Sequence, residues 1–245
     1  MRKSLLLLVA CGVAFTTRAS EKITLKAADG LEITGDLYIV NDNAPYILLC
    51  HQAGYSRGEY VVTAERFNKL GYNCLAIDQR SGNSVNNIPN ETYQRAKAKN
   101  LPTEYLDAEQ DIVAGIDYLY ERSHQPITLL GSSYSASLAL TIAAKNDKVG
   151  AVIAFSPGEY FGTKLNVKES IKGLNKPTFV ASSKAEGAAV KELISDIPAD
   201  KKQQFYPGLE GIHGSRALWK SCESNQEYWL SLIRFLSNIK KENNG

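Results

Sequence analysis

The chain lacks a strong excess of charge of either sign and, beyond its first residues, any long apolar run. Lysines and arginines number 28 against 26 aspartates and glutamates, for a formal net charge of +2. With charges this balanced, the sequence lacks the excess of basic residues that binds nucleic acid, so no such partner is expected. No segment after residue 19 is apolar over the roughly 20 residues that a membrane-spanning helix needs. Hydrophobic residues at 44% and charged residues at 22% are typical of a folded globular protein, which excludes disorder as the main state.

Cysteine and histidine are also scarce, which excludes a disulfide framework and a metal site. The four cysteines and three histidines show no cluster with the spacing of metal ligands, so we expect no metal and no cofactor. Cys50 ends one predicted strand and Cys74 begins the next. In parallel neighbours they would lie at opposite ends of the sheet, beyond the Cα separation of about 7 Å that a disulfide allows. We expect Cys50, Cys74 and Cys222 to be buried, unpaired residues.

The N-terminus is typical of a secretory signal peptide. Arg2 and Lys3 precede an apolar run, and Ala19 ends a stretch with small residues at the cleavage-relevant positions. We expect cleavage after Ala19, which gives a signal peptide over 1–19 and a mature domain over 20–245. Cleavage removes three positive charges and no negative ones, so the formal net charge falls from +2 to −1. The predicted location is secreted or periplasmic.

A second interpretation of the N-terminus stays open. Residues 8–11, Leu-Val-Ala-Cys, resemble the lipobox of bacterial lipoproteins, which would place a lipid on Cys11. The apolar run continues past Cys11, which favours simple cleavage. Membrane contact is therefore expected only if Cys11 is lipidated.

Short apolar runs alternate with helical patterns along the rest of the chain. An antiparallel-looking pair comes first, joined by a turn at Asp29-Gly30. Several of the later runs are apolar throughout, as expected where helices cover both faces of a parallel sheet. The predicted strands are 22–27, 31–40, 46–50, 72–77, 127–130, 151–155, 178–182 and 204–206, and the predicted helices are 59–70, 91–98, 103–122, 134–145 and a long C-terminal one.

This alternation predicts an α/β fold in one domain. We expect a three-layer α/β/α sandwich with a mostly parallel sheet and antiparallel N-terminal strands. The segments between strands are short, so no large lid domain is expected. The least regular part is the asparagine-rich segment 81–101, which gives no specific chemistry.

Residues 127–135 carry the strongest chemical signal. An apolar strand leads into Gly-Ser-Ser-Tyr-Ser, and a helix of small residues follows. A Gly-x-Ser-x-Gly sequence in this context is typical of a nucleophile elbow, whose sharp turn requires small residues two positions before and after the serine. Gly131 and Ser135 occupy these positions around Ser133, with serine replacing the second glycine. We predict Ser133 as the nucleophile; Ser132 is the alternative, although a bulky tyrosine lies two residues after it.

A serine hydroxyl is a weak nucleophile until a base takes its proton. Only His51, His124 and His213 offer an imidazole. His124 precedes the elbow strand, at the wrong end of a parallel sheet, and His51 is expected to brace a turn. His213 follows the last predicted strand between flanking glycines, which suits a loop above the carboxyl edge of the sheet. We predict His213 as the base; a histidine that merely caps the final helix is the alternative.

The base needs an acid that fixes its tautomer and stabilises its protonated form. In this arrangement the acid follows the nucleophile and precedes the histidine. Glu186 follows the strand 178–182 and is our first choice. Glu159, after the preceding strand, is its rival. A third possibility is that Glu186 only opens the next helix, where its charge suits the helix dipole.

The fourth element is a pair of backbone N–H groups for a developing oxyanion. Residues 46–54 form a buried strand that ends in a His-x-x-Gly turn, and such a turn can supply one N–H. We predict Ala53 as this donor, with Gln52 second. The other N–H belongs to the residue after the nucleophile, Tyr134.

Together these motifs resemble the α/β-hydrolase family, in particular its small, lid-poor members related to dienelactone hydrolases and bacterial carboxylesterases. The resemblance runs from the His51 turn through Asp78-Gln79-Arg80, the Ser133 elbow and the Glu186 loop to His213, nearly the whole mature chain. We expect Asp78 and Arg80 to pair locally and hold their loop. Departures from the family pattern are serine at 135, glutamine at 52 and glutamate at 186, and they leave the subfamily open.

The resemblance implies the chemistry. Relatives cleave esters, thioesters or, less often, peptides without a cofactor. By that resemblance Ser133 would attack a carbonyl, an acyl-enzyme would form, and water activated by His213 would release it. The expected partner is a small-molecule ester, and the oligomeric state is left open. The aromatic residues that are candidates to wall an acyl pocket, or to belong to the core, are Tyr55, Tyr134, Tyr160 and Phe161.

Two alternatives to an esterase remain at this point. A serine peptidase or aminoacyl hydrolase would use the same three residues. A non-catalytic binding protein on the same scaffold would predict loss of at least one of them, whereas serine, glutamate and histidine are all present at 133, 186 and 213. Haloalkane dehalogenase chemistry is disfavoured, because it would require an aspartate at position 133.

Overall fold

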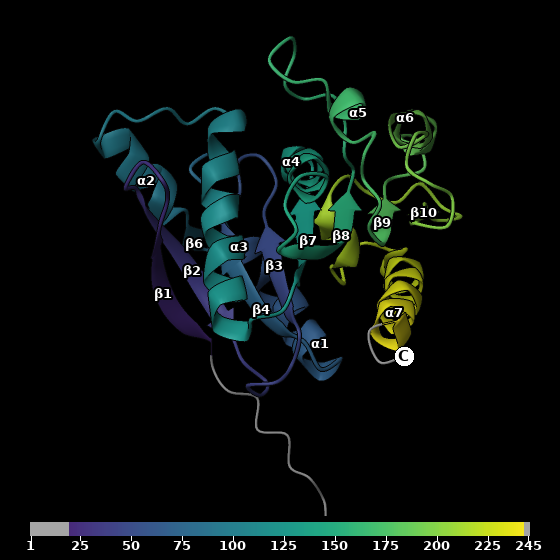
Figure 1. Ribbon diagram of the computed structural model, residues 1–245, viewed down its shortest axis with the longest axis horizontal. Coiled ribbons are helices and arrows are strands. Elements are labelled where there is room, and N and C mark those ends of the chain that lie inside the picture. Colours follow the sequence, from purple (N-terminus) through teal and green to yellow (C-terminus); the bar gives the residue numbers. More distant parts are fainter. Residues whose placement is uncertain (1–19, 243–245) are drawn as a thin grey trace, which may run out of the picture.

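One eight-stranded sheet organises the computed structural model, which describes residues 20–242. The strand order is β1-β2-β4-β3-β7-β8-β9-β10, with β1 and β2 at one side of the sheet and β10 at the other (Figure 1). Neighbours from β4 to β10 are parallel, whereas β1–β2 and β2–β4 are antiparallel. The strands are β1 Glu21–Lys26, β2 Glu32–Tyr38, β3 Tyr46–Cys50, β4 Asn73–Ile77, β7 Ile127–Ser132, β8 Val149–Phe155, β9 Thr178–Ala181 and β10 Lys202–Phe205.

Helices cover both faces of this sheet. The α-helices are α1 Val61–Lys69, α2 Glu91–Ala98, α3 Glu109–Ser123, α4 Tyr134–Ala143, α5 Val167–Ser170, α6 Gly187–Leu193 and α7 Asn225–Glu242. Short 3-10 helices are η1 Arg57–Tyr60, η2 Leu106–Ala108 and η3 Ser215–Leu218, and a small ribbon pairs β5 Ser84–Val85 with β6 Ile88–Pro89. Helices α3, α4 and α6 pack in one hydrophobic core, and α1 and α7 pack in the other.

Strand β3 shows why the central runs are apolar at every position. Leu48 and Cys50 belong to the core under α3, whereas Ile47 and Leu49 belong to the core under α1 and α7. All five residues of the strand are buried. Each fully buried aliphatic side chain contributes roughly 2 kcal/mol to folding. A strand that alternated polar and apolar residues would lose about half of this contribution. Because alternate residues of β3 are buried in two different cores and its neighbours are parallel, the predicted parallel sheet with both faces covered is confirmed.

The predicted fold class and the order of the main elements are confirmed. All eight predicted strands are present with ends shifted by up to two residues, and the helix predicted over 91–98 has those bounds. The helix predicted over 103–122 begins later, because η2 precedes α3, and Tyr105 lies outside it with a partly exposed ring. The ribbon β5–β6 and the four-residue helix α5 were not predicted, because elements this short show no periodicity.

The cysteines are unpaired and buried, as predicted. Cys50 lies opposite Ile77 in the register of β3 and β4, and Cys74 lies opposite Ile47. The two thiols are therefore separated along the strands. Within residues 20–242 no helix is long and apolar enough to span a membrane. The predicted signal peptide and Cys11 lie outside the described residues.

Candidate active site

The turn at Ser133 has the geometry of a strained elbow. Ser133 has φ 59° and ψ −123°, between the end of β7 and the start of α4. A non-glycine residue in this region costs on the order of 1–3 kcal/mol. Its N–H donates to the carbonyl oxygen of Phe155 at 2.8 Å, which holds the turn against β8. A Cβ atom at Gly131 would lie 2.2 Å from the carbonyl oxygen of Ser135, so only glycine fits two residues before the serine.

The serine at position 135 replaces the usual glycine and connects α4 to the turn after β3. Its hydroxyl donates to the carbonyl oxygen of His51 at 2.6 Å and accepts from Gln79 Nε2 at 2.5 Å. The side chain is fully buried. The departure from the family pattern therefore has a structural role, because glycine could make neither bond.

His213 lies beside the serine, as the sequence predicts. Its Nε2 is 2.8 Å from Ser133 Oγ, and its Nδ1 is hydrogen-bonded to Glu186. The ring is 42% exposed, so water and substrate can reach it. The loop can approach this closely because the next residue is Gly214, at φ 75°, where a Cβ atom would lie 2.2 Å from Gln52 Oε1.

The Glu186 carboxylate is held by two serines that sequence analysis missed. Its Oε2 accepts from Ser156 Oγ at 2.8 Å and from the N–H and hydroxyl of Ser183, each at 2.9 Å. Burial alone would raise the pKa of Glu186, but the hydrogen bonds from His213 and the two serines lower it to about 2. The group is thus ionised at neutral pH and can stabilise a protonated imidazole. Ser156 directly follows β8 and Ser183 lies two residues after β9, both at the carboxyl edge, and this position was the signal in the sequence.

The competing candidates lie elsewhere. Glu159 accepts from the N–H groups of Val167 and Lys168 at 2.8 and 2.9 Å, so its side chain is engaged at the start of α5. Ser132 is fully buried in β7, and its Oγ accepts from the N–H of Ser215. His124 caps the C-terminal end of α3 in the left-handed conformation, before the start of β7, whereas Ser133 follows the end of that strand.

In the turn after β3, the N–H of the predicted oxyanion donor has no protein acceptor within the part of the chain that the structure describes. The N–H of Gln52, our second choice, donates to Glu59 Oε2 at 2.8 Å. The carbonyl oxygen of Gln52 accepts from the N–H of Tyr55 and is 2.9 Å from His51 Nδ1. Among residues 20–242 no protein group accepts from the N–H of Ala53 or of Tyr134. These two amides are therefore available to a bound group.

His51 braces this turn and is neutral. Its Nε2 accepts from the N–H of Gln79 at 3.0 Å, so Nδ1 carries the proton that is donated to the carbonyl oxygen of Gln52. Burial lowers the pKa of His51 to about 4. The ring is fully buried and has no free nitrogen for chemistry. It has the structural role that the sequence predicts.

The expected pairing of Asp78 with Arg80 is wrong. Asp78 pairs with Arg57 at 2.7 Å, whereas Arg80 pairs with Asp111 at 2.7 Å and with Asp29 at 2.7 Å. Each of the two side chains has a partner from a distant segment of the chain. The two ion-pair groups fasten the N-terminal strands and α3 to the carboxyl edge.

Not all of the aromatic residues that are candidates for a pocket wall are exposed. Tyr134 is fully buried and Phe161 belongs to the core, so neither can line an open pocket. Tyr160 is 36% exposed, and its hydroxyl donates to the carbonyl oxygen of Ser156 at 2.8 Å. Tyr105 is 38% exposed and stacks on Tyr134 with ring centroids 4.5 Å apart.

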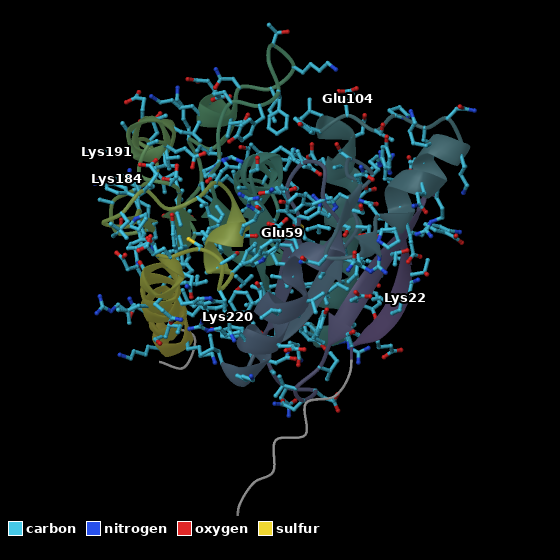
Figure 2. The ribbon with its side chains drawn as sticks, turned by 180° about the vertical axis from the view of Figure 1, so that it is seen from behind. Lys22, Glu59, Glu104, Lys184, Lys191 and Lys220 are labelled. Atoms are coloured by element: carbon cyan, nitrogen blue, oxygen red, sulfur yellow. The ribbon has the colours of Figure 1, made fainter. Side chains whose placement is uncertain are left out.

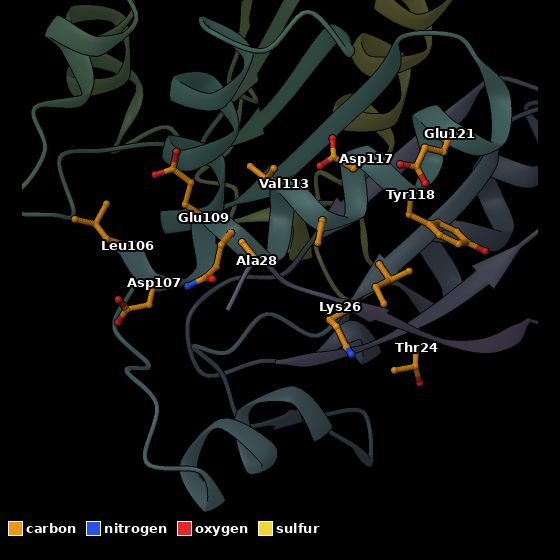
Figure 3. A pocket seen from close by; sticks show the side chains of 13 residues that line it. Thr24, Lys26, Ala28, Leu106, Asp107, Glu109, Val113, Asp117, Tyr118 and Glu121 are labelled. Atoms are coloured by element: carbon orange, nitrogen blue, oxygen red, sulfur yellow. The ribbon is translucent and has the colours of Figure 1, made fainter. Parts of the chain in front are cut away.

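Two cavities of about 750 Å³ each lie away from these residues. Figure 3 shows the first, which is lined by side chains of β1 such as Thr24 and Lys26 and of α3 such as Val113 and Asp117. The second lies at the starts of the parallel strands. Ser133 lines neither of them. Within residues 20–242 no group of three or more histidine, cysteine, aspartate or glutamate side chains is placed to hold a metal ion.

Comparison with known proteins reveals similarity in fold without similarity in sequence. No protein-family model and no curated protein sequence matches the chain. An esterase of Pyrococcus furiosus superposes with a TM-score of 0.67 at 17% identity, over 89% of this chain and 92% of that one. A dienelactone hydrolase of Anabaena variabilis gives a TM-score of 0.65 at 15% identity, over 89% of this chain and 96% of that one. The thioesterase domain from the curacin biosynthetic pathway gives 0.62 at 14% identity, over 88% and 100%.

Identities this low carry the fold and not the activity. The superpositions cover 89% of the chain, and its own sheet is mostly parallel with antiparallel N-terminal strands. The chain therefore has the α/β-hydrolase fold, without a large lid domain among residues 20–242, in the form that it shares with small esterases and a dienelactone hydrolase.

Proposed function

We propose that this protein is a serine hydrolase that cleaves carboxylic esters or thioesters of small molecules. The observation that carries the proposal is the hydrogen-bonded series Ser133–His213–Glu186, formed by three residues far apart in the chain. Strain at Ser133 and the free amides of Ala53 and Tyr134 support the same chemistry.

Acylation begins at the serine hydroxyl. His213 Nε2 takes the proton of Ser133 Oγ as the oxygen attacks the substrate carbonyl carbon. The carbonyl oxygen becomes an oxyanion, which the N–H groups of Ala53 and Tyr134 stabilise. The protonated imidazole is stabilised by the ionised Glu186, and it then protonates the departing alcohol or thiol. The acyl group stays on Ser133 as an ester.

Deacylation repeats these steps with water. His213 takes a proton from a water molecule that attacks the acyl carbonyl, and the same two amides stabilise the second oxyanion. When this intermediate collapses, Ser133 Oγ leaves and recovers a proton from His213. The carboxylic acid product is released and the enzyme returns to its starting state. No external cofactor takes part.

The type of bond is supported by the named neighbours. The similar structures are called an esterase, a dienelactone hydrolase and a thioesterase domain, which favours oxygen or sulfur esters over peptides. The side chain of His213 is 42% exposed, so water can reach the reacting groups.

A panel of substrates tests the proposal directly. Purified protein is assayed with p-nitrophenyl esters of two to twelve carbons, matching thioesters and aminoacyl p-nitroanilides, beside Ser133→Ala. We expect turnover of short esters or thioesters and at least a thousandfold lower kcat in the variant. Activity on anilides alone would favour a peptidase, and no turnover of any substrate would favour a binding protein.

We also propose that residues 1–19 direct export and are then removed. The proposal rests on the charged, apolar and small-residue pattern of the sequence. Mass spectrometry of protein from a bacterial periplasm should give a chain that begins at Ser20. A mature chain that begins at a lipid-modified Cys11 would instead support membrane anchoring.

A further inference from the structure

Glu59 is a buried acidic residue that the proposed mechanism does not use. It lies in η1 with 1% of its surface exposed, near the middle of the molecule, whereas Lys22 and Lys191 lie toward the periphery (Figure 2). Burial raises the pKa of Glu59 to about 7, although hydrogen bonds from Ser215 and Gln52 oppose the shift. A carboxyl group in such a place is costly unless its oxygens are hydrogen-bonded.

Both oxygens of Glu59 are bonded to segments of the candidate site. Oε2 accepts from the N–H of Gln52 at 2.8 Å, and Oε1 accepts from the hydroxyl of Ser215 at 2.5 Å. The backbone carbonyl of Glu59 also accepts from Trp219 Nε1 at 3.0 Å. One residue thus contacts the turn before Ala53 and the segment that follows the histidine.

A third segment joins the same group of contacts. The N–H of Ser215 donates to Ser132 Oγ at 2.8 Å, directly before the nucleophile. On the other side of the turn, Ser135 holds the carbonyl oxygen of His51. The elbow, the turn after β3 and the start of η3 are therefore linked through Glu59 and its hydrogen-bond partners.

The contact with Gln52 bears on the oxyanion site. The peptide group between His51 and Gln52 is fixed at both ends, because its oxygen accepts from Ser135 and its N–H donates to Glu59. The next N–H along the chain belongs to Ala53, which has no protein acceptor among the described residues. An oxyanion donor must point to within a few tenths of an ångström of the right place to be effective. Loss of the acceptor on Glu59 would let this peptide plane rotate.

We propose that Glu59 is a positioning residue, whose acceptor oxygens hold the Ala53 turn and the His213 loop in the arrangement that stabilises the transition state. The inference rests on the proposed hydrolase function. Glu59 itself does not touch substrate. Its effect passes through the amide of Ala53 and the imidazole of His213.

Four variants separate positioning from packing. Glu59→Leu keeps the volume and removes both acceptors, and such buried apolar replacements commonly fold. Glu59→Met is a second acceptor-free variant. Glu59→Gln keeps one acceptor oxygen, which can face the N–H of Gln52 while its amide group donates to the Ser215 hydroxyl. The control is Glu65→Gln, which removes an exposed carboxylate from the adjacent helix α1.

The readouts are kcat, KM, the inhibition constant of a trifluoromethyl ketone, and the thermal midpoint. The ketone forms a tetrahedral adduct with serine, so its affinity reports the oxyanion site. For both acceptor-free variants we expect kcat to fall ten- to a hundredfold and the inhibition constant to rise by a similar factor, with KM within threefold. Glu59→Gln should keep at least ten times the kcat of Glu59→Leu, and the control should match the wild type.

The outcomes separate this inference from the function on which it rests. A wild type without esterase or thioesterase activity overturns both. An active wild type whose Glu59→Leu variant folds and keeps its kcat and ketone affinity overturns the inference alone, as does a Gln variant no better than the Leu variant. If neither acceptor-free variant folds, Ser215→Ala decides: kcat three- to tenfold lower supports the inference, and unchanged kcat overturns it.

Discussion

The hydroxyl of Ser135 donates a hydrogen bond to the carbonyl oxygen of His51, at 2.6 Å. The first residue lies two positions after the candidate nucleophile, and the second begins the turn that carries the candidate oxyanion amide. One side chain therefore joins the elbow to the turn that carries the candidate oxyanion amide, at the position where the Gly-x-Ser-x-Gly motif has its second glycine.

Replacement of Ser135 by alanine should affect both stability and rate. The carbonyl oxygen of His51 would lose a buried donor, which typically costs about 1–3 kcal/mol. The turn at 51–54 would loosen, so kcat for a short p-nitrophenyl ester should fall about tenfold while KM changes little. Urea unfolding and steady-state kinetics measure the two effects. Ser195→Ala, at an exposed serine, is the control, and a Ser135→Ala variant equal to it would contradict this role.

The two candidate acids predict different variants. Glu186→Gln can no longer stabilise a protonated His213, so kcat should fall by about a thousandfold or more. Glu159→Gln should keep kcat within about threefold and lose on the order of 1 kcal/mol of stability, because its carboxylate accepts from the amides at the start of α5. Parallel assays decide between them. Loss of activity in Glu159→Gln alone would reverse the assignment.

Gly131→Ala tests the tightness of the elbow. Its Cβ atom would lie 2.2 Å from the carbonyl oxygen of Ser135, which is backbone and cannot move aside. We expect a loss of several kcal/mol in unfolding free energy, or an unfolded product, by analogy with overpacked cores. At Gly173 a Cβ atom meets nothing within 4 Å, so Gly173→Ala should leave stability within about 0.5 kcal/mol. Equal thermal midpoints for the two variants would refute the steric argument.

The fold was predictable because the central strands are apolar on both faces. Ile47 and Leu48 point to different cores, and this demand appears in the sequence as an unbroken apolar run. Ser133 and His213 were predictable because the carboxyl ends of parallel strands meet at one edge, so residues that follow β7 and β10 come together. Glu186 was indicated because the acid is expected to lie between the serine and the histidine in the sequence.

The partners of charged groups were not predictable. A glutamate at position 59 looks like an ordinary residue in the first turn of a helix, and periodicity does not reveal that the side chain is buried among loops from three segments. Asp78 and Arg80 are neighbours in sequence, but their partners Arg57 and Asp111 come from segments that only the tertiary fold brings near. Hydrogen-bond partners in loops follow from tertiary geometry, which local sequence does not encode.

The buried carboxyl of Glu59 should also make stability depend on pH. Its pKa rises from an ordinary 4.5 to about 7 on folding, so between these values the unfolded state binds fewer protons and stability falls as pH rises. His51, whose pKa is lowered to about 4, acts in the opposite sense below pH 6.5. The difference in unfolding free energy between wild type and Glu59→Gln isolates the first effect.

As pH rises from 4.5 to 7, the unfolding free energy of the wild type should fall by on the order of 3 kcal/mol relative to that of Glu59→Gln. Above pH 7 the difference between the two proteins should be constant. Urea unfolding at a series of pH values measures it. A difference that does not vary with pH would mean that the carboxyl of Glu59 titrates at its ordinary pKa.

Labelling with a fluorophosphonate tests the central claim most directly. Native wild type is treated with the probe, and the modified peptide is located by mass spectrometry, beside urea-unfolded protein and the Ser133→Ala and His213→Ala variants. We predict one adduct, on Ser133, that forms in native wild type and is absent from the other three samples. Native protein without an adduct, or with its adduct on another residue, would contradict the account.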